Sequence, residues 1–363
     1  MPPNARLANA RLSNDRFRVA LSGDFRRPDG SPAYPMFDLG PLEADPDIEV
    51  VHVDPVDGHL PADRLAGFDA AILLVPRFDA RSIPDDGRLA LVARFGVGYD
   101  SVDVDACTAA GIAVAITPDG VRRPVAVAIV TYLLALAGRL MAKDRLTRGG
   151  PATWHQRSDH MGLGLTTRTF AQLGVGNIGM EALRLLQPFG MRLIAHDPYI
   201  DPAAVAGLGV EMVGIDRLFA EADFLSVSVP LNPETRAIVD AGRLRSMKPS
   251  AYLINTARGP VVDQAALTRA LTEGWIAGAG LDVFEVEPCP ADDPLLRLDN
   301  VIFSPHSLCW TDECFAGIGA ADVRATLAVK RGTVPAGLVN RAVLDNPVWQ
   351  TRLAGLARRF GAG

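Results

Sequence analysis

Short apolar segments alternate with longer mixed segments along the first third of the chain. Each apolar segment is bounded by Gly, Pro or Asp, and the spacing between them leaves room for helices. Segments that are apolar on both faces and alternate with helices indicate a parallel sheet covered on both sides. We therefore predict strands at Phe17–Leu21, Ile48–Val53, Phe68–Val75, Leu89–Phe95 and Ile112–Ile116.

A second alternating series begins at Arg168. Helical segments are predicted within it, for example Ile178–Phe189 and Asp263–Glu273. The alternation again favours a parallel α/β unit, so the chain carries two such units. The predicted strands are Thr169–Leu173, Arg192–His196, Val210–Val213, Phe224–Val229, Ala251–Asn255, Ile276–Leu281 and Val301–Ser304.

A long apolar helix is predicted between the two series. Pro124 occupies a place typical of a first helical residue, and no breaker follows until Gly138. The helix is apolar nearly all round, which predicts that it is buried. The next segment, RLTRGGPATWHQRSDHMGLGL, interrupts the pattern with Gly and Pro. After Trp310 a helical run to Lys330 leads into a tail that we expect to pack on the first unit.

Length and composition agree with a soluble two-domain protein. The chain has 363 residues, 48% of them hydrophobic and 21% charged, and a net charge of −6. That charge argues against a nucleic-acid partner, because phosphate neutralisation needs a basic surface. Four cysteines provide no disulfide framework and favour a reducing compartment. The polar start lacks a signal-peptide core, and the longest apolar stretch is short for a membrane span, so we expect a cytoplasmic protein with no membrane partner.

A glycine pattern follows the first strand of the second series. Gly174, Gly176 and Gly179 have the G-x-G-x-x-G spacing between a predicted strand and a predicted helix. Such glycines permit a tight turn, close approach of a pyrophosphate, and close packing of helix and strand. Asp197 ends the next strand, where a carboxylate accepts hydrogen bonds from ribose hydroxyls and repels a 2′-phosphate, so we predict NAD as the cofactor. The alternative is a structural turn with Asp197 as a helix cap.

Three polar residues follow later strands of the second unit: Arg258, Glu287 and His306. Ligands of open α/β sheets bind at the carboxyl ends of the strands. We predict that His306 exchanges a proton with an alcohol or ketone, that Glu287 holds the imidazole, and that Arg258 binds a substrate carboxylate. Asp282 is placed to accept a hydrogen bond from the nicotinamide amide. Each residue alone is compatible with a surface role, and Glu287 with an ordinary acidic loop.

A metal site is a weaker interpretation of the same region. His306, Cys309 and Cys314 lie close in sequence, but further ligands at suitable spacing are missing. We therefore predict no metal.

Four motifs give the chain a resemblance to the D-isomer-specific 2-hydroxyacid dehydrogenases: RFGVGYDSVD, LGVGNIG, NTARGPVVD, and GLDVFEVEP with SPH. The resemblance implies an α/β fold of two Rossmann-like domains, with a nucleotide domain inserted into a discontinuous, flavodoxin-like substrate domain. The implied limits are residues 1–122 plus 308–363 for the substrate domain and 123–307 for the NAD-binding domain.

The resemblance also assigns roles to individual residues. Arg258 binds the substrate carboxylate, Glu287 and His306 form an acid–base pair, and the backbone of Val97 and Gly98 contributes amides to the carboxylate. A homodimer formed through the nucleotide domain is implied as well. Further cofactor contacts are expected at Asn177, Ile178, Pro230, Thr235, Thr256 and Ala257.

Several positions depart from the family pattern. Val127 replaces an acidic residue, the bulky Trp310 follows His306, and Arg77 stands at a strand end where a small or apolar residue is usual. These departures argue against the smallest substrates, glyoxylate and hydroxypyruvate. Our hypothesis is that Arg77, together with Arg122 or Arg123, recognises a second anionic or polyhydroxyl end of the substrate.

Other functions share parts of this pattern. A dehydrogenase-like corepressor that senses NAD(H) keeps the same Arg, Glu and His, although this chain has short polar ends. A phosphoglycerate dehydrogenase-like enzyme fits the chemistry, although a C-terminal regulatory domain is missing. Formate dehydrogenases use a different polar set, and Glu287 argues against that assignment.

Overall fold

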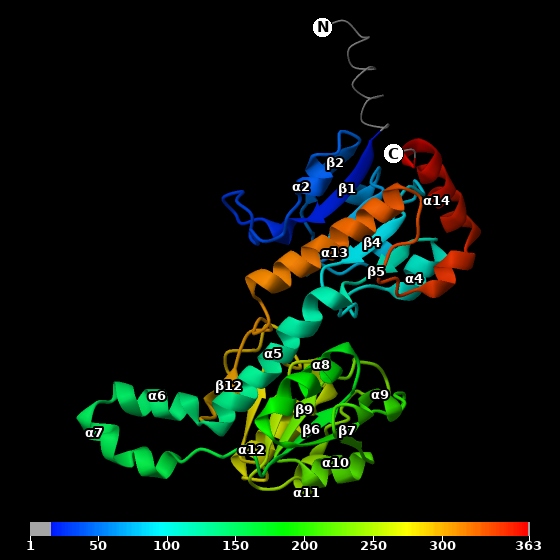
Figure 1. Ribbon diagram of the computed structural model, residues 1–363. Helices are drawn as coiled ribbons and strands as arrows, with labels where there is room; N and C mark the ends of the chain where they lie inside the picture. Colours follow the sequence, from blue (N-terminus) through cyan, green and yellow to red (C-terminus); the bar gives the residue numbers. More distant parts are fainter. Residues whose placement is uncertain (1–15, 362–363) are drawn as a thin grey trace, which may run out of the picture. The chain divides into compact units, whose positions relative to one another are not determined.

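The computed structural model describes residues 16–361, and most of the polar start of the chain, in which we expect no signal peptide, lies outside them. Internal contacts divide the chain into two units. The first takes the described chain up to Val121 and again from Thr311, and the second is Arg122–Trp310. Each unit contains one parallel sheet with helices on both faces (Figure 1), so the predicted α/β class is confirmed.

The sheet of the first unit has five parallel strands in the order β2-β1-β3-β4-β5. This is the flavodoxin-like order. The strands are β1 (Phe17–Ser22), β2 (Ile48–Val53), β3 (Ala70–Leu73), β4 (Leu91–Arg94) and β5 (Ala113–Ala115). The helices are α2 (Gly40–Glu43), α3 (Ala62–Leu65), α4 (Val104–Ala109), α13 (Asp312–Lys330) and α14 (Pro347–Phe360), with 3-10 turns at Gly23–Phe25, Ala80–Ser82 and Arg341–Asp345.

The C-terminal tail packs on this first sheet. The side chain of Asn340 accepts a hydrogen bond from Val114 N at 2.8 Å and donates to Ile112 O at 2.9 Å. Arg352, on α14, donates to the carbonyl oxygens of Leu89 and Gly111. The tail thus satisfies backbone groups at the sheet edge, which explains why it returns to the first unit.

The sheet of the second unit has seven parallel strands in the order β12-β11-β10-β9-β6-β7-β8. The order reverses at β6, as in a Rossmann sheet. The strands are β6 (Thr169–Leu173), β7 (Arg192–His196), β8 (Val210–Met212), β9 (Phe224–Val227), β10 (Tyr252–Asn255), β11 (Gly278–Leu281) and β12 (Val301–Phe303). The helices are α5 (Pro118–Ala137, which starts in the first unit), α8 (Asn177–Leu186), α9 (Ala203–Ala206), α10 (Ile215–Glu221), α11 (Ala241–Ser246) and α12 (Gln264–Thr272), with 3-10 turns at Gln187–Phe189, Gly259–Val261 and Pro294–Arg297.

The predicted start of the long helix is wrong. Helix α5 begins at Pro118, and Pro124 lies inside it. The first turn is held by packing against α13, where a side chain at Gly120 would come within 2.5 Å of Ile318 N. This close packing stabilises the helix upstream of the proline, whose missing N–H would otherwise favour a start at that residue.

The predicted burial of α5 on all sides is also wrong. Val127 is 46% and Leu134 43% exposed, while Ile129, Tyr132 and Leu133 on the other face are buried in the core. The helix is long and apolar enough to cross a membrane by length and composition, but 61% of its apolar window is buried inside the protein. It is therefore a core helix of this unit with one apolar face exposed.

The segment after α5, in which Gly and Pro interrupt the apolar pattern, forms short helices. We name Leu140–His160 the arm; it consists of α6 (Leu140–Arg148), α7 (Pro151–Trp154) and a 3-10 turn at His155–His160. Gly150 adopts a φ of +61° between the first two, and Pro151 starts the next helix. The arm projects from the second sheet and its helices (Figure 1). The Gly-Gly-Pro sequence therefore separates two helices instead of marking a loop.

Candidate functional site

The glycine-rich turn joins β6 to α8, as its spacing predicts. Gly174 has a φ of +88°, which favours glycine. A side chain at Gly179 would lie 2.1 Å from Gly174 O, so this position requires close contact between helix and turn. A side chain at Gly176 would meet no atom within 4 Å. The space above Gly176 is therefore open beside the N-terminus of α8, where backbone amides attract a phosphate. Asn177 and Ile178 are the first residues of that helix.

Asp197 directly follows β7 and lies beside the same turn. Its Oδ2 accepts a hydrogen bond from Val175 N at 2.8 Å and its Oδ1 accepts one from Tyr199 N at 2.9 Å. Each carboxylate oxygen can accept a further hydrogen bond, so the carboxylate is oriented by the backbone and still able to bind ribose hydroxyls. The side chain is thus part of the turn rather than a cap of the following helix.

Two other strand ends complete the predicted cofactor site. Pro230 and Thr235 lie in the loop after β9, where Thr235 Oγ1 hydrogen bonds to Pro230 O. Thr256 and Ala257 follow β10, and Ala257 N donates to the Asn255 side chain. The hydroxyl oxygens of Thr256 and Ser228 are buried without a hydrogen-bond partner in the described chain. Unsatisfied hydroxyls at this sheet edge fit a site for a polar ligand, and Ser228 was not singled out from the sequence.

Glu287 and His306 meet directly. His306 Nδ1 lies 2.8 Å from Glu287 Oε2, and the other carboxylate oxygen, Oε1, accepts from Phe284 N at 3.0 Å. Burial raises the pKa of Glu287, but the hydrogen bonds from His306 and Phe284 outweigh it, so the pKa lies below its ordinary value. The carboxylate is therefore held in its ionised form, which orients the imidazole through Nδ1.

Arg258 lies in the turn after β10, close enough to Glu287 for its positive charge to lower the pKa of that carboxyl further. The buried Asn255 holds this turn, since its amide donates to Arg258 O at 3.0 Å. A side chain at Gly259 would lie 1.8 Å from Phe284 O. The glycine therefore allows the turn of Arg258 to approach the loop that carries Glu287. The structure brings Arg258, Glu287 and His306 together within the second unit.

Asp282 organises the segment that carries His306. Its backbone O accepts from His306 N at 2.7 Å, and its Oδ1 accepts from Ser307 N at 2.9 Å and Leu308 N at 3.1 Å. The hydroxyl of Ser304 donates to the same oxygen. Three successive amides converge on Asp282, which supports the left-handed backbone of His306, with its φ of +52°.

The predicted substrate residues of the first unit follow its strands. Val97 and Gly98 come after β4 and are half-buried, next to Gly96, whose N donates to Thr117 Oγ1 at 3.0 Å. Arg77 comes after β3 and is exposed, and within the described chain its guanidinium makes no hydrogen bond or ion pair. Its backbone is fixed, because Arg77 N donates to Gly58 O at 2.8 Å. The backbone therefore holds a free cation at the carboxyl edge of the first sheet.

Arg122 and Arg123, the other two cations of the hypothesis of a second substrate contact, lie in the first turns of the long helix α5. Both belong to α5 and to the second unit, and Arg123 pairs with Glu181 on α8 at 2.7 Å. Trp310 is 46% exposed and its N donates to Ser307 O at 2.9 Å. Because Arg123 is already paired with an acid, Arg77 is the better placed candidate for a second substrate contact. Among residues 16–361, no group of three or more His, Cys, Asp or Glu could hold a metal ion.

Comparison with known proteins agrees with this geometry. Residues 130–307 match the sequence profile described as "D-isomer specific 2-hydroxyacid dehydrogenase, NAD binding domain". The chain is 40% identical over 285 residues to a glyoxylate reductase from Korarchaeum cryptofilum, covering 78% of this chain and 86% of that protein. It is 39% identical to a D-3-phosphoglycerate dehydrogenase from Mycobacterium bovis, covering 77% of this chain and 53% of that protein.

A solved structure is similar to most of the chain. The structure of D-lactate dehydrogenase from Aquifex aeolicus, complexed with NAD and lactic acid, aligns with a TM-score of 0.76 and 28% identity, covering 89% of this chain and 99% of that one.

Proposed function

Because this chain belongs to the D-isomer-specific 2-hydroxyacid dehydrogenase family, we propose that Arg258, Glu287 and His306 carry out its NAD-linked interconversion of 2-hydroxy and 2-oxo acids. The observation that carries this assignment is the 2.8 Å contact between His306 Nδ1 and Glu287 Oε2, with the charge of Arg258 beside it. In this proposal residues 123–307 form the NAD-binding domain, and residues 1–122 with 308–363 form the substrate domain.

The residues around the glycine-rich turn would hold NAD. Gly174, Gly176, Gly179, Asn177 and Ile178 surround the pyrophosphate. Asp197 takes the ribose hydroxyls, and Asp282 offers its Oδ2 to the amide of the nicotinamide, since Oδ2 accepts no hydrogen bond from the described chain. The remaining contacts are assigned to Pro230, Thr235, Thr256 and Ala257. Bound NAD supplies the acceptor for the hydride that leaves C2 of the hydroxy acid.

His306 moves the proton of the reaction. Its Nδ1 is hydrogen bonded to Glu287, so proton exchange with the substrate falls to Nε2. In oxidation, the O–H bond of the substrate breaks as its proton passes to Nε2, hydride leaves C2, and the C=O bond forms. In reduction, C2 of the 2-oxo acid accepts a hydride, the C=O double bond becomes a single bond, and the protonated imidazole returns the proton to the oxygen. Arg258 binds the carboxylate next to C2 through bidentate hydrogen bonds from its planar guanidinium.

We also propose that Arg77 binds a second anionic group on the substrate. Its guanidinium is exposed and unpaired within the described chain, although the loop that carries it has a fixed backbone. The amides of Val97 and Gly98 are assigned to the carboxylate next to C2. These assignments favour 2-oxo acids with a phosphate or a second carboxylate over glyoxylate.

A panel of 2-oxo acids tests the substrate assignment. NADH consumption is measured with glyoxylate, hydroxypyruvate, phosphorylated, dicarboxylic and sugar-derived 2-oxo acids. Arg77→Ala should raise the KM of the preferred anionic substrate and leave the KM of glyoxylate unchanged. Arg81→Ala is the matched control, since Arg81 is exposed on the same loop but already paired with Asp79. Equal effects of Arg77→Ala on both substrates would overturn the role of Arg77, and no turnover on any acid would favour an NAD(H)-sensing protein.

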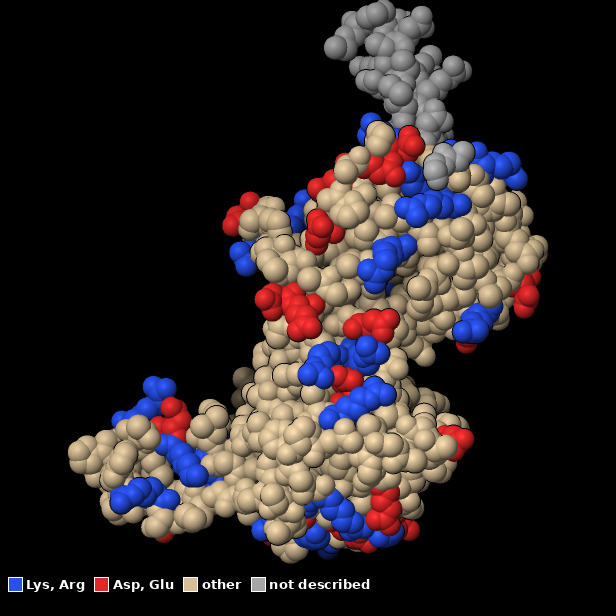
Figure 2. Space-filling view, viewed as in Figure 1, with Lys and Arg blue, Asp and Glu red and all other residues tan. Residues whose placement is uncertain are grey.

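We further infer a cytoplasmic homodimer whose partner molecules are small acids, with no nucleic acid and no membrane. All four cysteines are free, which suits a reducing compartment. Figure 2 shows acidic and basic side chains interspersed on the visible face, and the net charge of −6 does not suit binding to a polyanion. The exposed apolar face of α5 and the arm supply the surface for a second copy.

A further inference from the structure

The buried hydroxyl of Tyr132 lies outside every role assigned so far. Tyr132 is on α5, on the face of that helix that enters the core, and is 2% exposed. Its ring lies over β11, where a side chain at Gly280 would come within 2.7 Å of it. The glycine therefore creates the place in which the ring sits, and the hydroxyl is carried toward the end of the neighbouring strand β12.

The hydroxyl of Tyr132 begins a chain of hydrogen bonds. It lies 2.6 Å from Ser304 Oγ, and the Ser304 hydroxyl donates to Asp282 Oδ1. A serine hydroxyl has one proton to donate. Because that proton points to Asp282, the proton between Tyr132 and Ser304 belongs to Tyr132. Burial, more than any other influence, raises the pKa of Tyr132, so the phenol keeps this proton throughout the ordinary pH range.

This series of hydrogen bonds ends at Asp282, the residue that holds the backbone of the predicted acid–base residue His306. Asp282 Oδ1 receives Ser304 together with Ser307 N and Leu308 N, so every hydrogen bond to the carboxylate from the described chain reaches one oxygen. This fixes the rotation of the carboxylate and leaves Oδ2 open. The same residue holds His306 N through its backbone oxygen at 2.7 Å.

We propose that Tyr132 is a positioning residue that acts through Ser304 to fix the carboxylate of Asp282 for the nicotinamide end of the cofactor. This inference rests on the proposed function, in which Asp282 binds the nicotinamide amide and His306 moves the proton. Tyr132 touches neither cofactor nor substrate in this scheme. Its contribution is a single donated hydrogen bond that keeps Ser304 directed at Asp282.

The test separates the two ends of the cofactor. Affinity is measured for NADH by fluorescence and for ADP-ribose, which lacks the nicotinamide, by calorimetry. Tyr132→Phe and Ser304→Ala should each raise the Kd of NADH about 3- to 10-fold, the effect of one ordinary hydrogen bond, and leave the Kd of ADP-ribose unchanged. The double variant should equal Ser304→Ala alone, because Tyr132 acts only through Ser304.

Tyr252→Phe is the matched control. Tyr252 is buried in the same core, stacks on Phe224 at 5.4 Å, and makes no side-chain hydrogen bond in the described chain, so its variant should change neither affinity. An unchanged Kd of NADH in Tyr132→Phe, or equal changes for NADH and ADP-ribose, would overturn the inference. If Tyr132→Phe lowers the melting temperature severely, the Kd values of NADH and ADP-ribose are compared in Ser304→Ala instead.

The outcome is independent of the substrate. If the protein reduced no 2-oxo acid but showed the selective loss of NADH affinity, the proposed reaction would fail and the positioning role would stand. If reduction were normal in Tyr132→Phe with unchanged NADH affinity, the positioning role would fail and the reaction would stand.

Discussion

At the scale of single residues, the Glu287–His306 pair makes the most direct prediction. Glu287→Gln keeps the size of the side chain and removes the charge that stabilises a protonated imidazole. Reduction requires that protonated form, so its activity should fall off at a lower pH than in the unaltered protein. The pH profile of kcat for reduction, recorded from pH 5 to 9, measures this change.

The control for that experiment is His306→Ala, which should lower kcat about 10²- to 10⁴-fold at every pH and leave the Kd of ADP-ribose unchanged. A Glu287→Gln profile that coincides with that of the unaltered protein would show that the carboxylate does not act on the imidazole.

Asp322 makes a prediction about stability. It lies on α13, fully buried, with both carboxylate oxygens lacking a hydrogen-bond partner in the described chain. Burial raises the pKa of Asp322 well above the ordinary value of an aspartate, and the charge of Arg94 opposes this only in part. The folded protein therefore holds this proton more tightly than the unfolded chain does, and stability is lost as the pH rises above about 4.

Asp322→Asn removes the ionisation and should raise the melting temperature by a few degrees at pH 7 to 8. Near pH 4, where the unfolded carboxyl also becomes protonated, the two proteins should differ little. Scanning fluorimetry across this range gives the difference directly. A stabilisation that does not depend on pH would mean that charge is not the cause.

At the scale of elements, two glycines in the turn between β6 and α8 have different roles, one in cofactor binding and the other in the packing of the fold. Gly176→Ala meets no atom within 4 Å, whereas the added methyl in Gly179→Ala would lie 2.1 Å from Gly174 O. Gly176→Ala should keep the melting temperature and raise the Kd of NADH at least tenfold, because the methyl occupies the place of the pyrophosphate.

Gly179→Ala serves as the comparison. It should lower the melting temperature as well, with a cost of about 1–3 kcal/mol for the forced movement of helix and turn. Fluorimetry and NADH titration on both variants give the two readouts. A normal NADH affinity in Gly176→Ala would show that the cofactor does not bind at this turn.

The elements also show what the sequence could and could not predict. Each predicted strand corresponds to a strand of the structure, because short apolar runs that are bounded by Gly, Pro or Asp and separated by helix-length segments fit the buried strands of a parallel sheet. The first turn of α5 was missed because Gly120 packs on α13, a contact with a residue far along the chain. The terminal helix α14 was missed as well, since its Trp349 is buried only through the return of the tail to the first unit.

The candidate site likewise has a part that the sequence predicts and a part that it does not. Arg258, Glu287 and His306 could be found because strand ends of a parallel sheet share one edge. The contact between Tyr132 and Ser304 joins residues 172 positions apart, so no local pattern reveals it. The available indication was the tyrosine hydroxyl in the largely apolar VAVAIVTYLLALAG segment, because such a hydroxyl needs a hydrogen-bond partner once it is buried.

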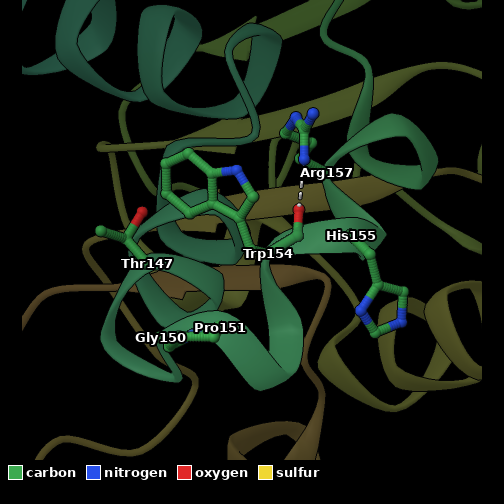
Figure 3. Close-up of a pocket in the computed structure, with 6 residues that line it drawn as sticks. All are labelled: Thr147, Gly150, Pro151, Trp154, His155 and Arg157. Carbon is green, nitrogen blue, oxygen red and sulfur yellow. Dashed lines mark hydrogen bonds between the residues drawn. The ribbon is translucent and has the colours of Figure 1, made fainter.

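At the scale of the whole molecule, the arm argues for association with a second copy. None of the residues of α6, α7 or the following 3-10 turn is buried, yet Leu140 is 58%, Trp154 55% and Met161, just beyond the arm, 75% exposed. The arm contains a hollow of about 470 Å³, lined by Thr147, Gly150, Pro151, Trp154, His155 and Arg157. Figure 3 shows how these residues lie on the helices of the arm. Short helices are marginally stable when they bury no side chain, so a partner surface that covers the arm would stabilise them.

Leu134→Arg tests this association. Leu134 lies on the exposed face of α5, about two helical turns after Val127, and a charge there would be buried unpaired between two copies. Light scattering of the unaltered protein should give twice 38.6 kDa, and Leu134→Arg should lower this toward one chain. Val348→Arg is the control, because Val348 is equally exposed but lies on α14 of the first unit. A single-chain mass for the unaltered protein at micromolar concentration would contradict the dimer, since an apolar face of this kind would then remain in water.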